Sequence, residues 1–298
     1  MPATGLRRIR IVLMAMLSML IAVPSMAQLI EQPQGYRFED SGFLTIPGNL
    51  AYDSGRNLLA MADKGSRLIY IFDLSDKTYQ TIGQDRELPE PSGLAFDNRG
   101  NLYATFEKTN YILIYRQQSD IPDTLGLLPI LPEPPKNPGR LYIDHDGFKY
   151  IIDNDKGVIY VINGDNNLVR TIREKLKHPD GVLMEPSGEL IIADKGFDPI
   201  LVFNPNFEFE RRFTRPQSPT DQFSFNASGL AIDQRGWIYT LDITRNRVVT
   251  YDPTGVSQTF WAPENVAFFP VDIAIDRYDH IFISETGSGS VKTYVRGN

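Results

Sequence analysis

Short apolar runs separated by turn-forming residues recur along almost the whole chain. The clearest copy, Ser228–Asp242, reads SGLAIDQRGWIYTLD: an apolar run, an Asp/Gly turn, and a second run of aromatic and β-branched residues. Runs of this kind, bounded by Asp and Gly, are typical of two short strands joined by a turn. The pattern therefore predicts a chain built mainly from β-hairpins.

Five further stretches repeat this pattern at a regular interval. They cover residues 49–63, 92–107, 141–153, 180–194 and 271–285. The first acid of each copy falls at Asp53, Asp97, Asp144, Glu185, Asp233 and Asp276, which gives a period of 41 to 48 residues. A repeat of roughly 40–50 residues with several strands per unit is typical of a β-propeller. We predict an all-β, six-bladed propeller with repeat cores near 49–73, 92–115, 139–162, 180–203, 228–251 and 271–295.

One complete blade can be traced in the fifth copy. Its strands are expected, from the channel outwards, at Ala227–Ile232, Trp237–Leu241, Arg247–Tyr251 and Ser257–Trp261. The acid of each turn can accept hydrogen bonds from its own turn backbone, and the glycine that follows can take the positive φ that the turn needs. The six turn acids therefore have a structural explanation.

The fifth copy also resembles the NHL repeat, which has a G-[IL]-A-[VI]-D core, a G-x-[IL]-Y-V strand and an N-x-R-[IV] strand. Gly229–Asp233, Gly236–Tyr239 and Asn246–Val248 carry this resemblance, and looser copies extend it over residues 41–298. The resemblance implies a six-bladed propeller. It leaves the function open, because propellers host enzymes and binding modules alike.

The last copy lacks a fourth strand of its own, because only three residues follow Val291–Val295. The segment Tyr36–Leu44 precedes the first blade and belongs to no other copy. We predict that this N-terminal segment completes the last blade. The ring would then close, with no long edge strand left exposed.

Residues 1–27 have the features of a cleaved signal peptide: a basic start, an apolar run at Ile11–Val23, and small residues before Gln28. This apolar run is too short to cross a bilayer, which takes about 20 residues. Cleavage would remove three arginines and no acid, so residues 28–298 would form a single mature propeller domain with a formal charge of −10 instead of −7. The chain has no cysteine, which excludes disulfides and a lipoprotein anchor. We expect a monomer in a bacterial periplasm or outside the cell, without a membrane span.

Candidate binding residues lie where the innermost strands begin, at the mouth of the central channel. The residues five positions before the turn acids are Gly48, Ser92, Gly139, Asp180, Ser228 and Val271. At the next position, Arg140 and Asp272 belong to opposite blades and are expected to face each other across the ring. Together with Asp180 and Asn49 they form either a small polar binding site or an ion-pair network that plugs the channel.

Two groups of propeller enzymes bear on a possible metal. Lactonases of the gluconolactonase/SMP30 type hold a divalent cation with Glu, Asn and Asp from different blades, and Asp180 in the sequence HPDG is similar to their Pro-Asp-Gly aspartate. Ser, Gly and Val stand where the other carboxylate or amide ligands of a hard cation are needed. Peptidylglycine-amidating lyases bind zinc through histidines, but His145, His178 and His280 occupy unequal places in their blades. We therefore expect no cofactor, with a cation such as Ca²⁺ in the channel as the alternative.

The loops after the second strand of each blade carry basic residues. The sequence Asp-Lys-Gly occurs there three times, and the candidate contacts on this rim are Lys64, Lys156, Lys195 and Arg245. Aromatic residues cluster before blades 5 and 6, where Trp261 and Phe269 are candidate contacts. A basic rim can steer an anionic partner, and aromatic residues are enriched in interface cores. Both features also have structural explanations, as solvated loop cations and as wedges between blades.

These observations favour an exported, non-catalytic recognition or scaffold protein whose channel-mouth face binds a protein, peptide or glycan of the cell envelope. The acidic charge argues against nucleic acid as a partner. The alternative is a divalent-metal-dependent lactonase or related hydrolase, in which Asp180 and Asp272 act on the substrate through the cation. The two hypotheses differ in whether three or more oxygen ligands converge at the channel mouth.

Overall fold

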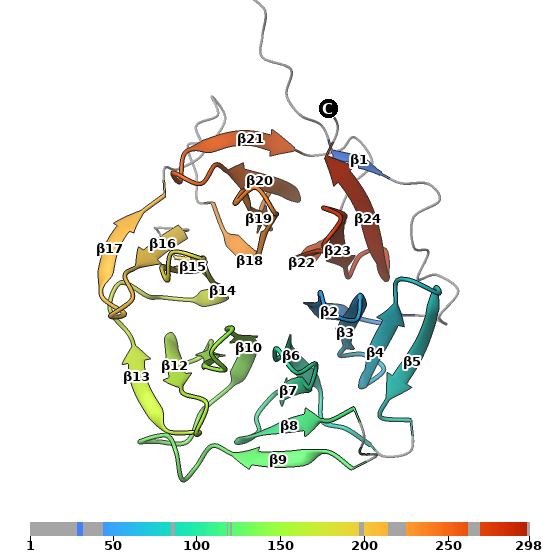
Figure 1. Cartoon of the computed structure of the whole chain (residues 1–298), viewed down its shortest axis with the longest axis vertical. Coiled ribbons are helices and arrows are strands. Elements are labelled where there is room, and N and C mark those ends of the chain that lie inside the picture. Colours follow the sequence, from blue (N-terminus) through green and yellow to red (C-terminus); the bar gives the residue numbers. More distant parts are fainter. Residues whose placement is uncertain are drawn as a thin grey trace, which may run out of the picture.

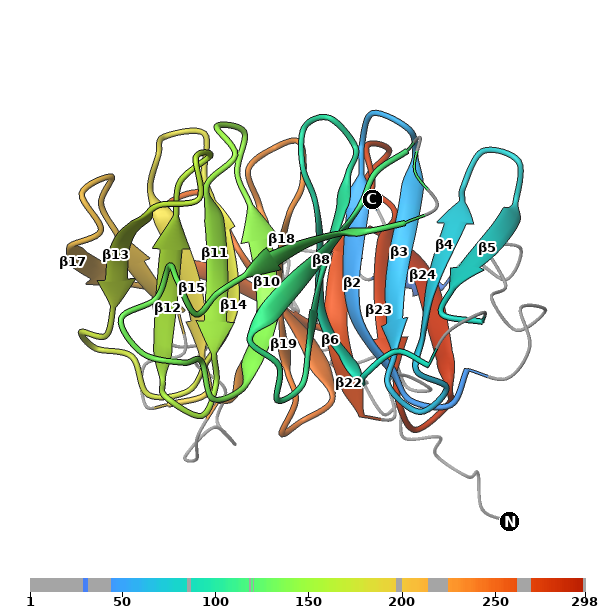
Figure 2. The same ribbon diagram turned by 90° about the horizontal axis from the view of Figure 1, so that it is seen from below.

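The computed structural model describes residues 29–31, 44–84, 87–117, 119, 121–196, 200–213, 225–261 and 269–296. Its strands form six antiparallel sheets of four strands each, arranged as blades around a central channel (Figure 1). Seen from the side, the innermost strands run along the channel (Figure 2). The predicted all-β, six-bladed propeller is confirmed. The proposed signal peptide, residues 1–27, lies outside the described residues.

Each blade contributes four strands, which follow one another from the channel outwards. Blade 1 consists of β2 (Pro47–Asp53), β3 (Leu58–Asp63), β4 (Leu68–Asp73) and β5 (Thr78–Ile82), and blade 2 of β6 (Pro91–Phe96), β7 (Leu102–Phe106), β8 (Tyr111–Tyr115) and β9 (Asp123–Gly126). Blade 3 consists of β10 (Pro138–Ile143), β11 (Lys149–Asp153), β12 (Val158–Ile162) and β13 (Leu168–Ile172), and blade 4 of β14 (Pro179–Met184), β15 (Leu190–Asp194), β16 (Ile200–Phe203) and β17 (Phe209–Arg212). Blade 5 consists of β18 (Ala227–Ile232), β19 (Ile238–Asp242), β20 (Arg247–Tyr251) and β21 (Ser257–Trp261), and blade 6 of β22 (Pro270–Ile275), β23 (Ile281–Glu285), β24 (Ser290–Arg296) and β1 (Leu29–Glu31).

The hydrophobic core lies between neighbouring blades. The middle strands are buried on both faces; every residue of β12, for example, is buried. One core cluster joins Met61 and Phe72 of blade 1 to Phe282 of blade 6, and another joins Ile69 of blade 1 to Leu102 of blade 2. Apolar side chains on both faces of a strand therefore hold the ring together.

The turns of the repeat are built as the sequence predicts. Asp233 Oδ1 accepts hydrogen bonds from the backbone N–H groups of Arg235 and Trp237, both at 2.9 Å. The same type of turn is made at Asp97, Asp144 and Asp276. The four strands of blade 5 also lie where they are expected, except that β19 begins one residue later than predicted, at Ile238.

A second row of acids lies at the ends of the second strands. Asp63, Asp153, Asp194, Asp242 and Glu285 each end the second strand of a blade and are buried. Asp194 accepts hydrogen bonds from the N–H groups of Lys177, at 2.8 Å, and of Gly196, at 2.6 Å. Asp63 and Asp153 accept backbone N–H groups of their loops in the same way. Because a buried N–H without a partner costs about 1–3 kcal/mol, these three carboxylates stabilise the loops that they contact.

The N-terminal strand closes the last blade, but it is not the predicted segment. β1 pairs antiparallel with β24 at its outer edge, with Leu29 opposite Arg296 and Glu31 opposite Tyr294 (Figure 1). The prediction that Tyr36–Leu44 supplies this strand was wrong. The chain must pass from the outer edge of blade 6 to the channel, where β2 begins at Pro47, so the strand has to lie further upstream.

Candidate functional site

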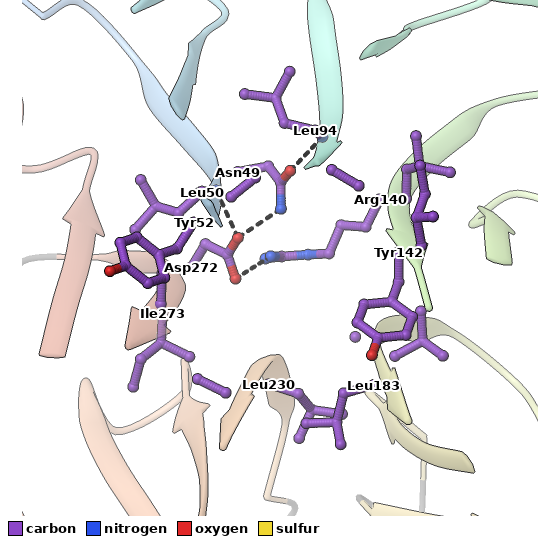
Figure 3. Close-up of a pocket in the computed structure, with 18 of the residues that line it drawn as sticks. Asn49, Leu50, Tyr52, Leu94, Arg140, Tyr142, Leu183, Leu230, Asp272 and Ile273 are labelled. Atoms are coloured by element: carbon purple, nitrogen blue, oxygen red, sulfur yellow. Dashed lines mark hydrogen bonds and ion pairs between the residues drawn. The ribbon is translucent and has the colours of Figure 1, made fainter. Parts of the chain in front are cut away.

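Arg140 forms the centre of a polar network that crosses the channel. It lies on β10 and extends towards Asp272 on β22 of the opposite blade (Figure 3), where its Nη1 pairs with Asp272 Oδ1. Its Nε lies 3.4 Å from Asp180 Oδ2. Its Nη2 donates to the carbonyl oxygen of Val271, at 2.5 Å, and to Ser228 Oγ, at 3.2 Å. The guanidinium group is thus surrounded by oxygen atoms from blades 4, 5 and 6.

The Asp272 carboxylate connects this network to blades 1 and 2. Its Oδ2 accepts hydrogen bonds from Asn49 Nδ2, at 2.6 Å, and from the backbone N–H of Leu50, at 2.8 Å. Asn49 Oδ1 in turn accepts one from the N–H of Leu94. Gly229 has a positive φ of 64°, and a Cβ at this position would lie 2.5 Å from Asp272 Oδ1. A glycine is therefore needed at position 229 for the backbone conformation and for the space that Asp272 occupies.

The Asp180 carboxylate has cations on both sides. Its Oδ1 lies 3.0 Å from Lys195 Nζ, and its Oδ2 accepts a hydrogen bond from Ser228 Oγ and faces Arg140. All four oxygen atoms of the two carboxylates therefore have a donor, and two cations balance two anions. Residues of all six blades take part in this network, which holds the ring together at its axis.

Burial and neighbouring charges have opposite effects on the pKa values of Arg140, Asp180 and Asp272. The side chains of Arg140, Asp180 and Asp272 are 11%, 10% and 4% exposed. Burial would lower the pKa of Arg140, but Asp272 and Asp180 outweigh it and raise this pKa. Burial would raise the pKa of Asp180, but Arg140 and Lys195 outweigh it and lower this pKa. At Asp272 burial dominates and raises the pKa, against the pull of Arg140. The carboxylates are stable as anions only because cations lie beside them.

The network divides the channel into two compartments. The first, which we call the mouth pocket, has a volume of about 350 Å³ and includes the six strand-start residues predicted to point to the mouth: Gly48, Ser92, Gly139, Asp180, Ser228 and Val271. The second, which we call the inner chamber, has a volume of about 300 Å³. Leu94, Leu183, Leu230 and Ile273 lie around it, with the network on one side (Figure 3).

The wall of the mouth pocket is polar on the side of blades 1 to 4. Lys64, Glu107, Asn154 and Lys195 each directly follow the second strand of their blade and line the pocket. Lys64 Nζ lies 2.5 Å from Glu107 Oε1, with 35% and 26% of these side chains exposed. In blade 5 the equivalent residue is Ile243. The pocket thus offers cations, a carboxylate and an amide on one side and an apolar surface on the other.

The sequence-predicted site residues divide into two groups. Asn49, Arg140, Asp180 and Asp272 come together in the network, and Lys64 and Lys195 line the mouth pocket. Of the other candidates, Lys156, Arg245 and Phe269 are not among the described residues that line it.

Lys156, Arg245 and Phe269 have other surroundings. Lys156 pairs with Glu133 at 3.3 Å, and Arg245 with Asp242 at 3.2 Å. Trp261 ends β21, the outermost strand of blade 5, and its side chain lies outside the described part of the structure. Phe269 precedes β22 and is 65% exposed.

Sequence reasoning missed Glu107 and Asn154. It located the rim from the repeated Asp-Lys-Gly sequence, but Asp153, not Asp155, is the equivalent of Asp63 and Asp194. Asn154 therefore takes the place of the pocket lysine in blade 3, and Lys156 lies two residues further along its loop. Counting from the acid that ends the second strand would have found Asn154, but not Glu107, because β7 ends at Phe106.

The oxygen ligands expected for a metal in this fold are already engaged. Each carboxylate oxygen of Asp180 and Asp272 contacts an N–H or O–H donor or a cationic side chain. No three His, Cys, Asp or Glu side chains are grouped to hold a metal ion in the part of the chain that the structure describes. His280, for example, bonds through Nδ1 to the turn acid Asp276 at 2.7 Å. The residues present therefore do not fit a divalent cation at the propeller axis.

Comparison with solved structures finds several proteins that share this fold. A gluconolactonase from Xanthomonas campestris matches with a TM-score of 0.68 and 14% identity, over 92% of this chain and 99% of the other. A virginiamycin B lyase from Staphylococcus aureus matches with a TM-score of 0.63 and 15% identity, over 90% and 88% of the two chains. A luciferin-regenerating enzyme matches with a TM-score of 0.68 and 12% identity, over 88% and 96%. The chain shares their six-bladed propeller fold.

The comparisons of sequence gave no match. No family model and no curated protein matches the chain. Within the described ranges there is no helix with the length and hydrophobicity needed to cross a membrane. The likeness to solved structures therefore establishes the fold, and the site must be interpreted from its own residues.

Proposed function

We propose that this protein is a hydrolase or lyase that acts on a small polar molecule held in the mouth pocket. The observation that supports this is the convergence of Lys64, Glu107, Asn154 and Lys195 from four successive blades on one open pocket of about 350 Å³. This volume suits a small organic molecule better than a polypeptide. The structural neighbours named gluconolactonase, virginiamycin B lyase and luciferin-regenerating enzyme favour the same class.

The pocket residues supply the groups that hydrolysis of a lactone or ester needs. The partly exposed carboxylate of Glu107 can take a proton from an attacking water. The ammonium groups of Lys64 and Lys195 can stabilise the negative charge that develops on the carbonyl oxygen. Asn154 lies between these cations in the ring of blades and can orient the substrate through its amide. The apolar surface at Ile243 and Val271 leaves room for an uncharged part of the substrate.

Hydrolysis of lactones and esters by purified protein is the corresponding test. We expect wild-type protein to open D-glucono-1,5-lactone or to cleave a small ester such as p-nitrophenyl acetate, followed by pH-stat or absorbance. Loss of the oxyanion-stabilising charge in Lys195→Gln should lower kcat/KM by about 10²-fold or more. Lys156→Gln is the matched control, because Lys156 is on the same rim but outside the pocket, and its activity should equal that of the wild type.

Two results would contradict this proposal. Equal activity in Lys195→Gln and the wild type would place the reaction elsewhere. If the wild-type protein converts none of a broad panel of lactones, esters and cyclic peptides, the support from the named neighbours is lost.

A second candidate, recognition of a cell-envelope protein, peptide or glycan, is favoured by the 65% exposure of Phe269 beside the mouth. Against it, each of the four rim cations has an acidic partner: Lys64 has Glu107, Lys156 has Glu133, Lys195 has Asp180 and Arg245 has Asp242. The rim is thus balanced in charge and is a weak attractant for an anionic surface.

A further inference from the structure

We propose that Arg140 is the resident cation of the propeller axis, and that its guanidinium group occupies a cage of oxygen atoms of the kind that binds a hard divalent cation. The protein would then need no metal at this position. The inference concerns which cation occupies the axis and not the reaction in the mouth pocket, so it does not depend on the proposed function.

The composition of the cage is the first argument. The four groups around the guanidinium are the carboxylates of Asp180 and Asp272, the hydroxyl of Ser228 and the backbone carbonyl of Val271. Carboxylate, hydroxyl and carbonyl oxygens are the ligands that Ca²⁺ and Mg²⁺ take in proteins. The oxygen atoms come from strands of three different blades, which meet only at the axis. These are the features of a cation site, and in this protein a side chain occupies it.

The charge balance is the second argument. Two carboxylates buried at the axis would repel each other and lose their hydration, and they need positive charge of equal size. Arg140 contacts both carboxylates, and Lys195 contacts Asp180 from the mouth pocket. The sum over these four groups is zero, so a divalent cation added to the network would bring two uncompensated charges.

The shape of the group is the third argument. A guanidinium is planar, stays protonated and donates in several fixed directions, whereas an ammonium is a single compact charge. Nε, Nη1 and Nη2 of Arg140 reach different partners and so replace the several bonds that a metal ion makes. Gly229 leaves the space that Asp272 needs to meet this plane.

Titration of wild-type protein with Ca²⁺, Mg²⁺ and Mn²⁺ is the primary test, because it requires no variant to fold. After treatment with EDTA, we expect no saturable heat by calorimetry and no cation-dependent rise in Tm. Saturable binding of a divalent cation that is lost in Asp180→Asn would overturn the inference. Since the readout is cation binding, such a result would leave the proposed hydrolase or lyase function untouched. A lack of enzymatic activity would likewise leave the assignment of Arg140 untouched.

Removal of the guanidinium gives a second, opposite test. Arg140→Ala leaves the four oxygen groups in place, and we expect this variant to gain a saturable, Ca²⁺-dependent rise in Tm that Asp272→Asn in the same chain abolishes. The matched control is Lys195→Met, which retains Arg140 and should gain no such response. A folded Arg140→Ala that ignores Ca²⁺, or a gain in Lys195→Met, would each contradict the assignment of Arg140 as the resident cation.

Discussion

Replacement of Arg140 by methionine is expected to lower the free energy of unfolding by about 3–5 kcal/mol at pH 7, because it leaves two buried carboxylates without the cation between them. Methionine retains much of the side-chain volume, so the decrease in the free energy of unfolding is due mainly to the lost charge and only in small part to lost packing. The control is Arg67→Met, which breaks an exposed pair with Glu87 and should cost less than about 1 kcal/mol. Urea unfolding followed by tryptophan fluorescence measures both.

The effect of Arg140→Met should also depend on pH. In wild-type protein the pKa of Asp180 is lowered, so its contribution to stability is present above the pKa of the unfolded chain and is lost as the pH falls. Burial is the largest influence on both carboxylates, so we expect their pKa values to rise without Arg140 and the folded variant to bind protons more tightly than the unfolded one. Its stability relative to the wild type should therefore recover as the pH falls from 7 towards 4. A constant difference over this range would contradict the ion-pair account.

Removal of β1 should have the second large effect. A chain that begins at residue 32 lacks the strand that pairs with β24 at Leu29, Ile30 and Glu31, whereas a chain that begins at residue 28 retains it. Each backbone hydrogen bond lost costs about 1 kcal/mol, and the exposed edge of β24 becomes a site for association between chains. We expect the shorter chain to have a lower Tm and to aggregate on heating. Hydrogen exchange localises the change, because the amides of Tyr294–Arg296 should exchange faster in the shorter chain; equal exchange in both would contradict the closure by β1.

The fold could be predicted from the sequence because the features that place the inner strands recur in every copy of the repeat. The acid of each turn and the apolar run before it, with a Gly after the acid in the first five copies, are local features, and they place the two inner strands of every blade. Ser228–Asp242 alone contains most of this information. The closing strand could not be placed in the same way, because β1 has three residues and no turn motif, and its partner β24 lies at the other end of the chain.

The candidate site was predicted only in part. Arg140 and Asp272 were expected to face each other, since strands at equivalent positions of opposite blades meet at the axis. The pairing of Asp180 with Lys195 was not predicted, because it depends on how far the loop after β15 leans over the mouth. The residues of a loop can be read from the sequence, but its contacts with Asp194, such as those of Lys177 and Gly196, are seen only in the structure.

The measurement that tests the central claim most directly is mass spectrometry of a bacterial metabolite extract incubated with wild-type protein, with Lys195→Gln, or with Lys156→Gln. If the mouth pocket is the active site, wild type and Lys156→Gln should deplete the same small polar compound and form its hydrolysis or elimination product, while Lys195→Gln should not. Identical metabolite profiles for all three proteins and for the extract alone would contradict an enzyme whose reaction takes place in the mouth pocket.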